Sequence, residues 1–106
     1  MGMKKVRLTF LGDLLCLKEQ MRLIKRYYND NYNCIFADIV PAVYSGGGYV
    51  VANLETPVAG RKLKLSYETM RFNAPEQFLE AIKNAGINHV SLANNHILDR
   101  GLVGLY

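Results

Sequence analysis

Polar side chains of the kinds that bind metals and transfer protons recur at three places in this chain. They are Asp13, then Asn53 and Glu55, then Asn94, Asn95, His96 and Asp99. Carboxylate oxygen, amide oxygen and imidazole nitrogen together form a ligand set that suits a divalent metal such as Mn, Fe or Zn. Two carboxylates and an asparagine can hold one metal or a close pair, which would lower the pKa of a bound water and polarise a phosphoryl or acyl oxygen. The residue types therefore indicate a hydrolytic or group-transfer centre.

The third group also contains a pair suited to proton transfer. An imidazole beside a metal, here His96, is a natural general acid, and Asp99, three residues later, could orient its ring. Asn53 and Asn94 are expected to line the same site. His89 lies near the start of a predicted strand, and we expect it to be structural.

Each group also has a plainer interpretation when it is taken alone. Gly12 and Asp13 are typical turn residues, and Glu55, which precedes Thr-Pro, can be an ordinary surface residue. The dipeptide Asn94-Asn95 is frequent in loops, and a lone histidine is more often structural than catalytic. The chemical interpretation is favoured because all three groups directly follow a predicted strand.

The hydrophobic pattern predicts three strands. Residues 6–11 alternate between apolar and polar types and stop at Gly12-Asp13, whereas residues 49–52 form a short apolar run typical of a buried strand. Residues 87–93 form the third strand and run into the Asn-Asn-His segment. Because parallel strands end at the same edge of a sheet, where ligands of α/β proteins gather, the three polar groups are expected on one rim.

Helices are predicted between these strands. Residues 17–28 have a helical period, and Asp38 could cap a short helix before the Ser-Gly-Gly-Gly loop that begins at Ser45. Asn73 is the expected cap of a further helix that stops at Gly86. The apolar stripe of this helix is Phe78, Leu79, Ile82 and Ala85. Two short alternating pieces within residues 60–72 could pair as an edge hairpin. The predicted fold class is α/β: a layered, mainly parallel sheet flanked by helices.

Composition and charge exclude several classes of protein. The 106 residues are 50% hydrophobic and 21% charged with a net charge of +4, which excludes a wholly disordered or collagen-like chain. No apolar run approaches the roughly 20 residues of a membrane helix. Asp13 interrupts the apolar stretch near the N-terminus, so no signal peptide is expected. The cysteines, Cys16 and Cys34, are expected to be free thiols, which suits a reducing compartment such as the cytoplasm.

The positive charge does not come with a nucleic-acid recognition motif. The cations of the first predicted helix are Lys18, Arg22, Lys25 and Arg26, and we expect them to form a solvated face. No nucleic-acid partner is therefore expected.

Several motifs resemble those of the bacterial capsule synthesis CapA family, named for poly-γ-glutamate capsule biosynthesis. They are Gly12-Asp13, Asn53-Leu54-Glu55-Thr56-Pro57, Phe72-Asn73-Ala74-Pro75, and Ser91-Leu92-Ala93-Asn94-Asn95-His96 with Asp99 and Gly101. They occur in order over nearly the whole chain. The combination of the Asn-Leu-Glu-Thr-Pro and Ser-Leu-Ala-Asn-Asn-His segments is specific.

The resemblance implies a fold and a site. The family is similar to the calcineurin-like metallophosphoesterases, whose layered α/β fold carries two divalent metals. By that resemblance Asp13, Glu55 and Asn95 are metal ligands, with Asn53 beside the second carboxylate. His96 corresponds to the histidine that acts on the leaving group.

The sequence departs from the metallophosphoesterase pattern in two ways. Leu15 stands where those enzymes usually have a histidine, and His89 and His96 are the two histidines of the chain. We therefore expect residues 1–106 to be the N-terminal portion of a CapA-type, metallophosphoesterase-like domain. This truncated portion would have little or no activity of its own.

The resemblance also implies partners. The expected substrate is an anionic polymer or a phosphoester. The alternative function is a non-catalytic module that scaffolds a membrane-bound polymer-synthesis complex. Family members often act at the cell surface, and a homo-oligomer is expected for a severed domain because its strand edges would be exposed.

Overall fold

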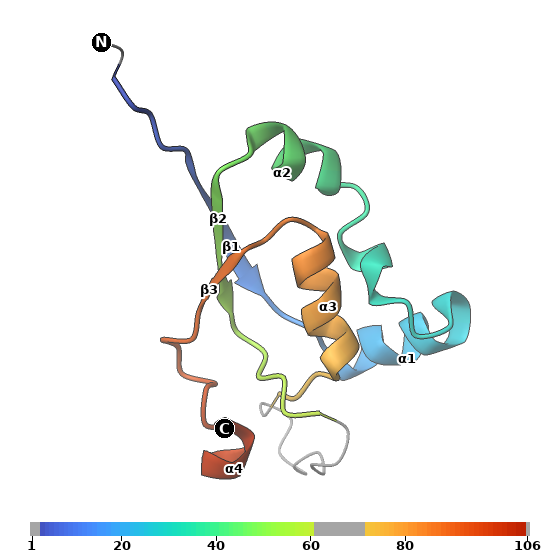
Figure 1. The fold of residues 1–106 in the computed structure, drawn as a ribbon. Coiled ribbons are helices and arrows are strands. Elements are labelled where there is room, and N and C mark those ends of the chain that lie inside the picture. The colour runs from blue at the N-terminus through green and yellow to red at the C-terminus, as the bar shows by residue number, and fades with distance from the viewer. Residues whose placement is uncertain (1–2, 61–71, 106) are drawn as a thin grey trace.

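The computed structural model describes residues 3–60 and 72–105, and its centre is a parallel three-stranded sheet (Figure 1). The strand order is β1-β2-β3, with β1 at Leu8–Leu14, β2 at Tyr49–Leu54 and β3 at His89–Ser91. Both neighbouring pairs are parallel. The α/β class and the adjacent parallel strands are thus as predicted, and all three strands end at one edge, called the carboxyl edge below.

The first strand begins and ends later than the sequence predicted, at residues 8–14 instead of 6–11. Pairing with β2 does not stop at Gly12; it resumes as Asp13 opposite Asn53 and Leu14 opposite Leu54, after a register shift that begins at Phe10. Leu14 is buried, and its carbonyl accepts hydrogen bonds from the backbone of Glu55 and Thr56. These contacts hold the end of β1 against β2, so the predicted stop at Gly12-Asp13 was wrong.

The third strand is shorter than predicted. Ile87 is buried but precedes the strand, and the side chain of Asn88 accepts a hydrogen bond from Val50 N and donates one to Gly48 O. The backbone N–H of Asn88 also donates to Val50 O at 3.2 Å, so its side chain adds to the main-chain contact just before β3. Beyond Ser91 the backbone leaves the sheet, with the Ser91 hydroxyl accepting a bond from Ala93 N.

The helices are α1 (Lys18–Tyr28), the 3-10 turn η1 (Tyr32–Ile35), α2 (Val40–Gly46), α3 (Glu76–Asn84) and α4 (Gly101–Leu105). Figure 1 shows α1, α2 and α3 on one side of the sheet. On the other face Leu8, Phe10 and Tyr49 are exposed. In the part of the chain that the structure describes, helices therefore cover one face of the sheet.

The core lies between the sheet and α3. Phe78 is almost completely buried, and its ring centroid lies 6.5 Å from that of Tyr32 and 6.2 Å from that of Phe36. Ile82 and Ala85 on the same side of α3 are also buried, but Leu79, predicted to belong to this stripe, is 46% exposed. Leu79 is exposed because it faces an open cavity described below.

Two predicted helix caps are wrong. Asp38 is exposed, and α2 begins after Ile39 without a side-chain cap, with a proline in its first turn that lacks an N–H. Asn73 is turned towards the preceding loop: its side chain accepts from Ala59 N and donates to Gly60 O. Pro75 takes the cap position of α3.

Glycines end two of the helices. Gly86 follows α3 with a φ of 90°, as the predicted stop requires. The α2 helix extends to Gly46, further than predicted, and the turn to β2 is made by Gly47 and Gly48, which both have positive φ. The predicted hairpin within residues 60–72 lies almost entirely outside the described residues.

The two cysteines are free thiols, as predicted. Cys16 is 1% exposed, and its backbone N–H donates a 2.9 Å hydrogen bond to the hydroxyl of Thr56, which is itself fully buried. Burial raises the pKa of the Cys16 thiol from 9.0 to about 11. Cys34 is partly exposed. None of the described helices has both the length and the apolar character needed to cross a membrane.

Candidate functional site at the carboxyl edge

An irregularity in β1 places Asp13 beside Asn53. Three residue steps separate Phe10 from Asp13, whereas two steps separate their partners Val51 and Asn53. In regular pairing Gly12 would lie opposite Asn53, and Asp13 would point to the other face of the sheet. The extra residue therefore turns Asp13 to the face that carries Asn53, which is a common use of bulges near functional sites.

The side chain of Asn53 connects two carboxylates. Its Nδ2 donates a 2.8 Å hydrogen bond to Asp13 Oδ1 and a 2.7 Å bond to Glu55 Oε2. Glu55 follows β2 directly, and its backbone N–H is bonded to Leu14 O at 3.1 Å. One amide group thus holds together the two carboxylates predicted as metal ligands.

The segment after β3 is attached to β2 through Asn94. The Nδ2 of Asn94 donates to Asn53 Oδ1 at 3.1 Å and to Leu54 O at 2.9 Å. Its Oδ1 accepts the backbone N–H of His96 at 2.9 Å. The two predicted lining residues, Asn53 and Asn94, are therefore in direct contact, and Asn94 fixes the position of the His96 backbone.

His96 lies between two carboxylates. Its Nδ1 is 2.8 Å from Asp99 Oδ2, and its Nε2 is 3.6 Å from Glu55 Oε1. The three side chains are between 11% and 17% exposed. When Nδ1 carries a proton, its N–H donates a hydrogen bond to Asp99, and Nε2 is the nitrogen that faces Glu55.

Phe72 is a member of the site that the chemistry of side chains did not predict. Its ring centroid lies 4.4 Å from that of His96, and its backbone N–H donates a 2.7 Å hydrogen bond to Asp99 Oδ2. The aspartate oxygen beside the imidazole is thus fixed by the main chain as well. The Phe-Asn-Ala-Pro motif contained this residue, but no property of a phenylalanine assigns it to a proton-transfer site.

Asn95, the remaining predicted ligand, follows Asn94 in the segment after β3. It is exposed, and the described residues give it no hydrogen-bond partner. His89 is the first residue of the three-residue strand β3, and its ring centroid lies 5.3 Å from that of Tyr49.

The donor types at the carboxyl edge suit a divalent cation, because they include two carboxylates and an imidazole. Asp13 and Glu55 share one amide donor, and His96 approaches the second carboxylate. Among residues 3–60 and 72–105, however, no group of three or more His, Cys, Asp or Glu side chains converges as a metal site would require. The described residues therefore fit part of a coordination sphere.

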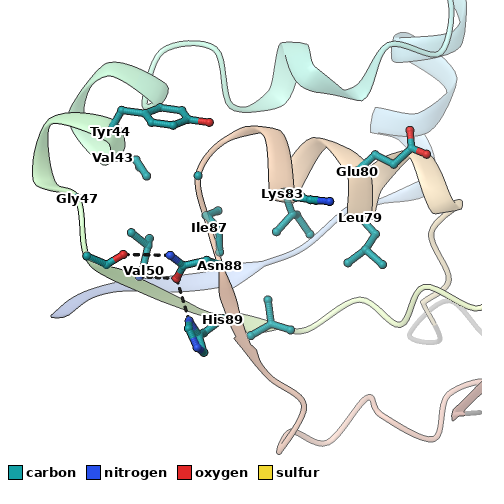
Figure 2. A pocket seen from close by; sticks show the side chains of 14 residues that line it. Val43, Tyr44, Gly47, Val50, Leu79, Glu80, Lys83, Ile87, Asn88 and His89 are labelled. Carbon is teal, nitrogen blue, oxygen red and sulfur yellow. Dashed lines mark hydrogen bonds between the residues drawn. The ribbon is translucent and has the colours of Figure 1, made fainter. Parts of the chain in front are cut away.

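A mostly apolar cavity lies elsewhere in the molecule. Figure 2 shows it between α2, α3 and the first residues of β2 and β3. Its volume is about 680 Å³. Its lining is mostly apolar and includes Val43, Tyr44, Leu79 and Ile87. Because Gly47 and Gly48 precede β2, the cavity lies at the amino ends of the strands and is separate from the carboxyl edge.

Comparison with known proteins identifies the family of the chain. The family model described as bacterial capsule synthesis protein PGA_cap matches residues 7–106. The chain therefore belongs to this family. The capsule biosynthesis protein CapA of Bacillus anthracis is 28% identical over 104 residues, which are 95% of this chain and 24% of that protein.

This family member thus spans about a quarter of the length of the curated relative that it matches. No solved structure matches the chain significantly. The match confirms the family that the sequence motifs predicted.

Proposed function

We propose that the carboxyl edge forms part of a divalent-metal site of metallophosphoesterase type, used in poly-γ-glutamate capsule biosynthesis. The observation that supports this most directly is the bridging of Asp13 and Glu55 by the single amide of Asn53, with His96 3.6 Å from Glu55. Asp13 and Glu55 would hold the metal, and Asn95, which the family resemblance matches to an amide ligand, would add its oxygen. The metal, when bound, lowers the pKa of a water and polarises the oxygen under attack.

The protein residues have distinct tasks in this proposal. Asp99 keeps the imidazole of His96 in one orientation, since its Oδ2 is also bonded to the Phe72 backbone. His96 then holds a proton at Nε2, the nitrogen that faces Glu55, and donates it to the leaving group. The ring of Phe72 covers one side of the imidazole and restricts the access of water.

The proposed substrate is an anionic polymer or a phosphoester. An amide-linked polyglutamate and a phosphoester both present a polar oxygen that a metal could polarise, so either suits a hydrolytic or group-transfer reaction at this edge. The capsule synthesis family name favours the polymer.

A non-catalytic function is the second candidate. Leu8 and Phe10 are 56% and 71% exposed on the uncovered face of the sheet, next to the candidate site. Such apolar side chains suit contact with another protein. In this alternative the chain contributes a binding surface to a membrane-bound polymer-synthesis complex.

Titration of the purified chain with Mn²⁺ or Zn²⁺ in a calorimeter tests the metal site. We expect a Kd weaker than about 1 μM, because two carboxylates and one amide are a small ligand set. Asp13→Asn and Glu55→Gln should each weaken binding further. Asp38→Asn, which changes an exposed aspartate near α2, is the control. A folded chain with no affinity for either metal, or with an affinity that both substitutions leave unchanged, would contradict the metal site and favour the scaffold.

A further inference from the structure

The orientation of the Asn94 amide is fixed by the main chain on both of its sides. Its Nδ2 faces a group that can act only as an acceptor, the carbonyl of Leu54 at 2.9 Å. Its Oδ1 faces a group that can act only as a donor, the backbone N–H of His96 at 2.9 Å. A rotated amide would place oxygen against oxygen and N–H against N–H, so one orientation satisfies both neighbours.

This orientation determines that of Asn53. Since Nδ2 of Asn94 is the donor to Asn53 at 3.1 Å, Asn53 must present its Oδ1 to Asn94. The Nδ2 of Asn53 then points the other way, towards Asp13 at 2.8 Å and Glu55 at 2.7 Å. The order of donors and acceptors therefore runs without conflict from two backbone groups, through two amides, to two carboxylates.

We propose that Asn53 is a positioning residue that gathers the carboxylates of Asp13 and Glu55, and that Asn94 sets its orientation. Because its Oδ1 is occupied by Asn94, Asn53 offers N–H groups rather than an oxygen to the space between the carboxylates. It is therefore not a metal ligand itself. The hydrogen bonds that lead from Leu54 O and His96 N through Asn94 and Asn53 to the two carboxylates are called the amide relay below. The effect on metal binding rests on the proposed function, whereas the amide relay does not.

The relay leaves one oxygen of each carboxylate available. Asn53 bonds Asp13 Oδ1 and Glu55 Oε2, so Asp13 Oδ2 and Glu55 Oε1 remain for a ligand, and the second of these is the oxygen near His96. Hydrogen bonds of this kind commonly orient carboxylates that bind metals. Two N–H donors also reduce the repulsion between two carboxylates that lie close together.

Aspartate cannot replace either asparagine in this relay. Aspartate at position 53 would have no donor for Asp13 and Glu55 and would add a third carboxylate. Aspartate at position 94 would have no donor for Leu54 O or for Asn53. The relay thus explains why amides, rather than carboxylates, occupy both positions.

Side-chain amide exchange, measured by NMR on the metal-free full chain, tests the relay. The Nδ2 protons of Asn53 should exchange about tenfold more slowly than those of Asn95, which has no partner among the described residues. Asn94→Ala should remove this protection from Asn53. The isosteric variant Asn94→Asp should do the same, and a thermal melt confirms that each variant is folded.

The matched control is Asn84→Ala. Asn84 is an exposed asparagine on α3 whose side chain donates to Asn33, and its loss should leave the exchange of Asn53 unchanged. Unprotected Asn53 protons in the unsubstituted chain, or protection that survives both substitutions at Asn94, would overturn the relay.

Titration with Mn²⁺ tests the positioning effect. Asn53→Ala and Asn94→Ala should each weaken binding by about 10- to 100-fold, and the double variant should be little weaker than the more affected single one. Asn84→Ala should bind like the unsubstituted chain. Unchanged affinity in Asn53→Ala would overturn the positioning role. Protected amides in a chain that binds no metal would leave the relay supported and contradict the proposed function instead.

Discussion

At the scale of single residues, the candidate site is held together by groups that do not react. His96 would carry the proton, yet its location depends on the Asn94 side chain, which binds its backbone, and on Asp99, which contacts its ring. Asp99 depends in turn on the Phe72 backbone. A substitution at any of these supporting residues is therefore expected to move the imidazole.

Burial of the Cys16 thiol predicts a pH-dependent loss of stability. The pKa is raised from 9.0 to about 11 in the folded chain, so an unfolded chain releases this proton at lower pH than the folded one. The free energy of unfolding should therefore fall as the pH rises from about 9 to about 11, by at most about 2–3 kcal/mol. Well below pH 9 the thiol is protonated in both states and contributes no pH dependence.

Denaturant unfolding of Cys16→Ala at pH 8 and at pH 11 isolates this contribution from other titrating groups. The variant should lose less stability between the two pH values than the unsubstituted chain does. Cys34→Ala, which changes the partly exposed cysteine, should behave like the unsubstituted chain. Equal losses in the two cysteine variants would refute the assignment.

At the scale of elements, the turn into β2 requires a glycine that the end of β1 does not. Gly48 has a φ of 70°, and an added Cβ would collide with the carbonyl oxygen of Arg7. Gly12 has a negative φ, and an added Cβ there would meet nothing within 4 Å. Gly48→Ala should therefore lower the free energy of unfolding by about 1–3 kcal/mol, and Gly12→Ala by about 0.5 kcal/mol or less. Denaturant titration of both variants compares the two sites, and equal losses would show that the close approach to Arg7 does not constrain the turn.

The sequence predicted which elements exist better than where they end. The alternation of apolar residues located β1, but the register shift before Asp13 depends on pairing with β2, a contact about 40 residues away. Local capping rules assigned Asp38 and Asn73 to helix starts. Asn73 instead forms contacts with Ala59 and Gly60, because those loop groups lie close only in the folded chain.

In the candidate site, too, the features that depend on contacts between distant segments could not be predicted. Parallel strands were sufficient to bring Asp13, Asn53 and Glu55 to one edge, because strand direction alone determines which ends meet. The orientation of the Asn94 and Asn53 amides was not predictable, because it depends on hydrogen bonds to the Leu54 carbonyl and to the His96 backbone. The exposure of Asn95 was equally beyond sequence analysis.

At the scale of the whole molecule, the candidate site and the uncovered sheet face are continuous. Asp13 and Asn53 point to the same face as Phe10 and Val51, because each pair of neighbours is in register. The helices α1, α2 and α3 lie on the other side (Figure 1). Anything that covers the apolar part of this face would therefore approach the carboxylates as well.

This exposed face predicts that the chain associates with itself. Leu8, Phe10 and Tyr49 are 56%, 71% and 49% exposed and lie side by side across β1 and β2, so their contact with a second copy would remove apolar surface from water. Light scattering at micromolar concentration should show a dimer or a larger assembly, and Phe10→Glu should shift it towards the 12.0 kDa monomer. Leu23→Glu, at a residue of α1 that is 55% exposed, is the control and should leave the assembly intact. A monomeric chain with a cooperative melt would show that the face stays exposed to solvent without driving association.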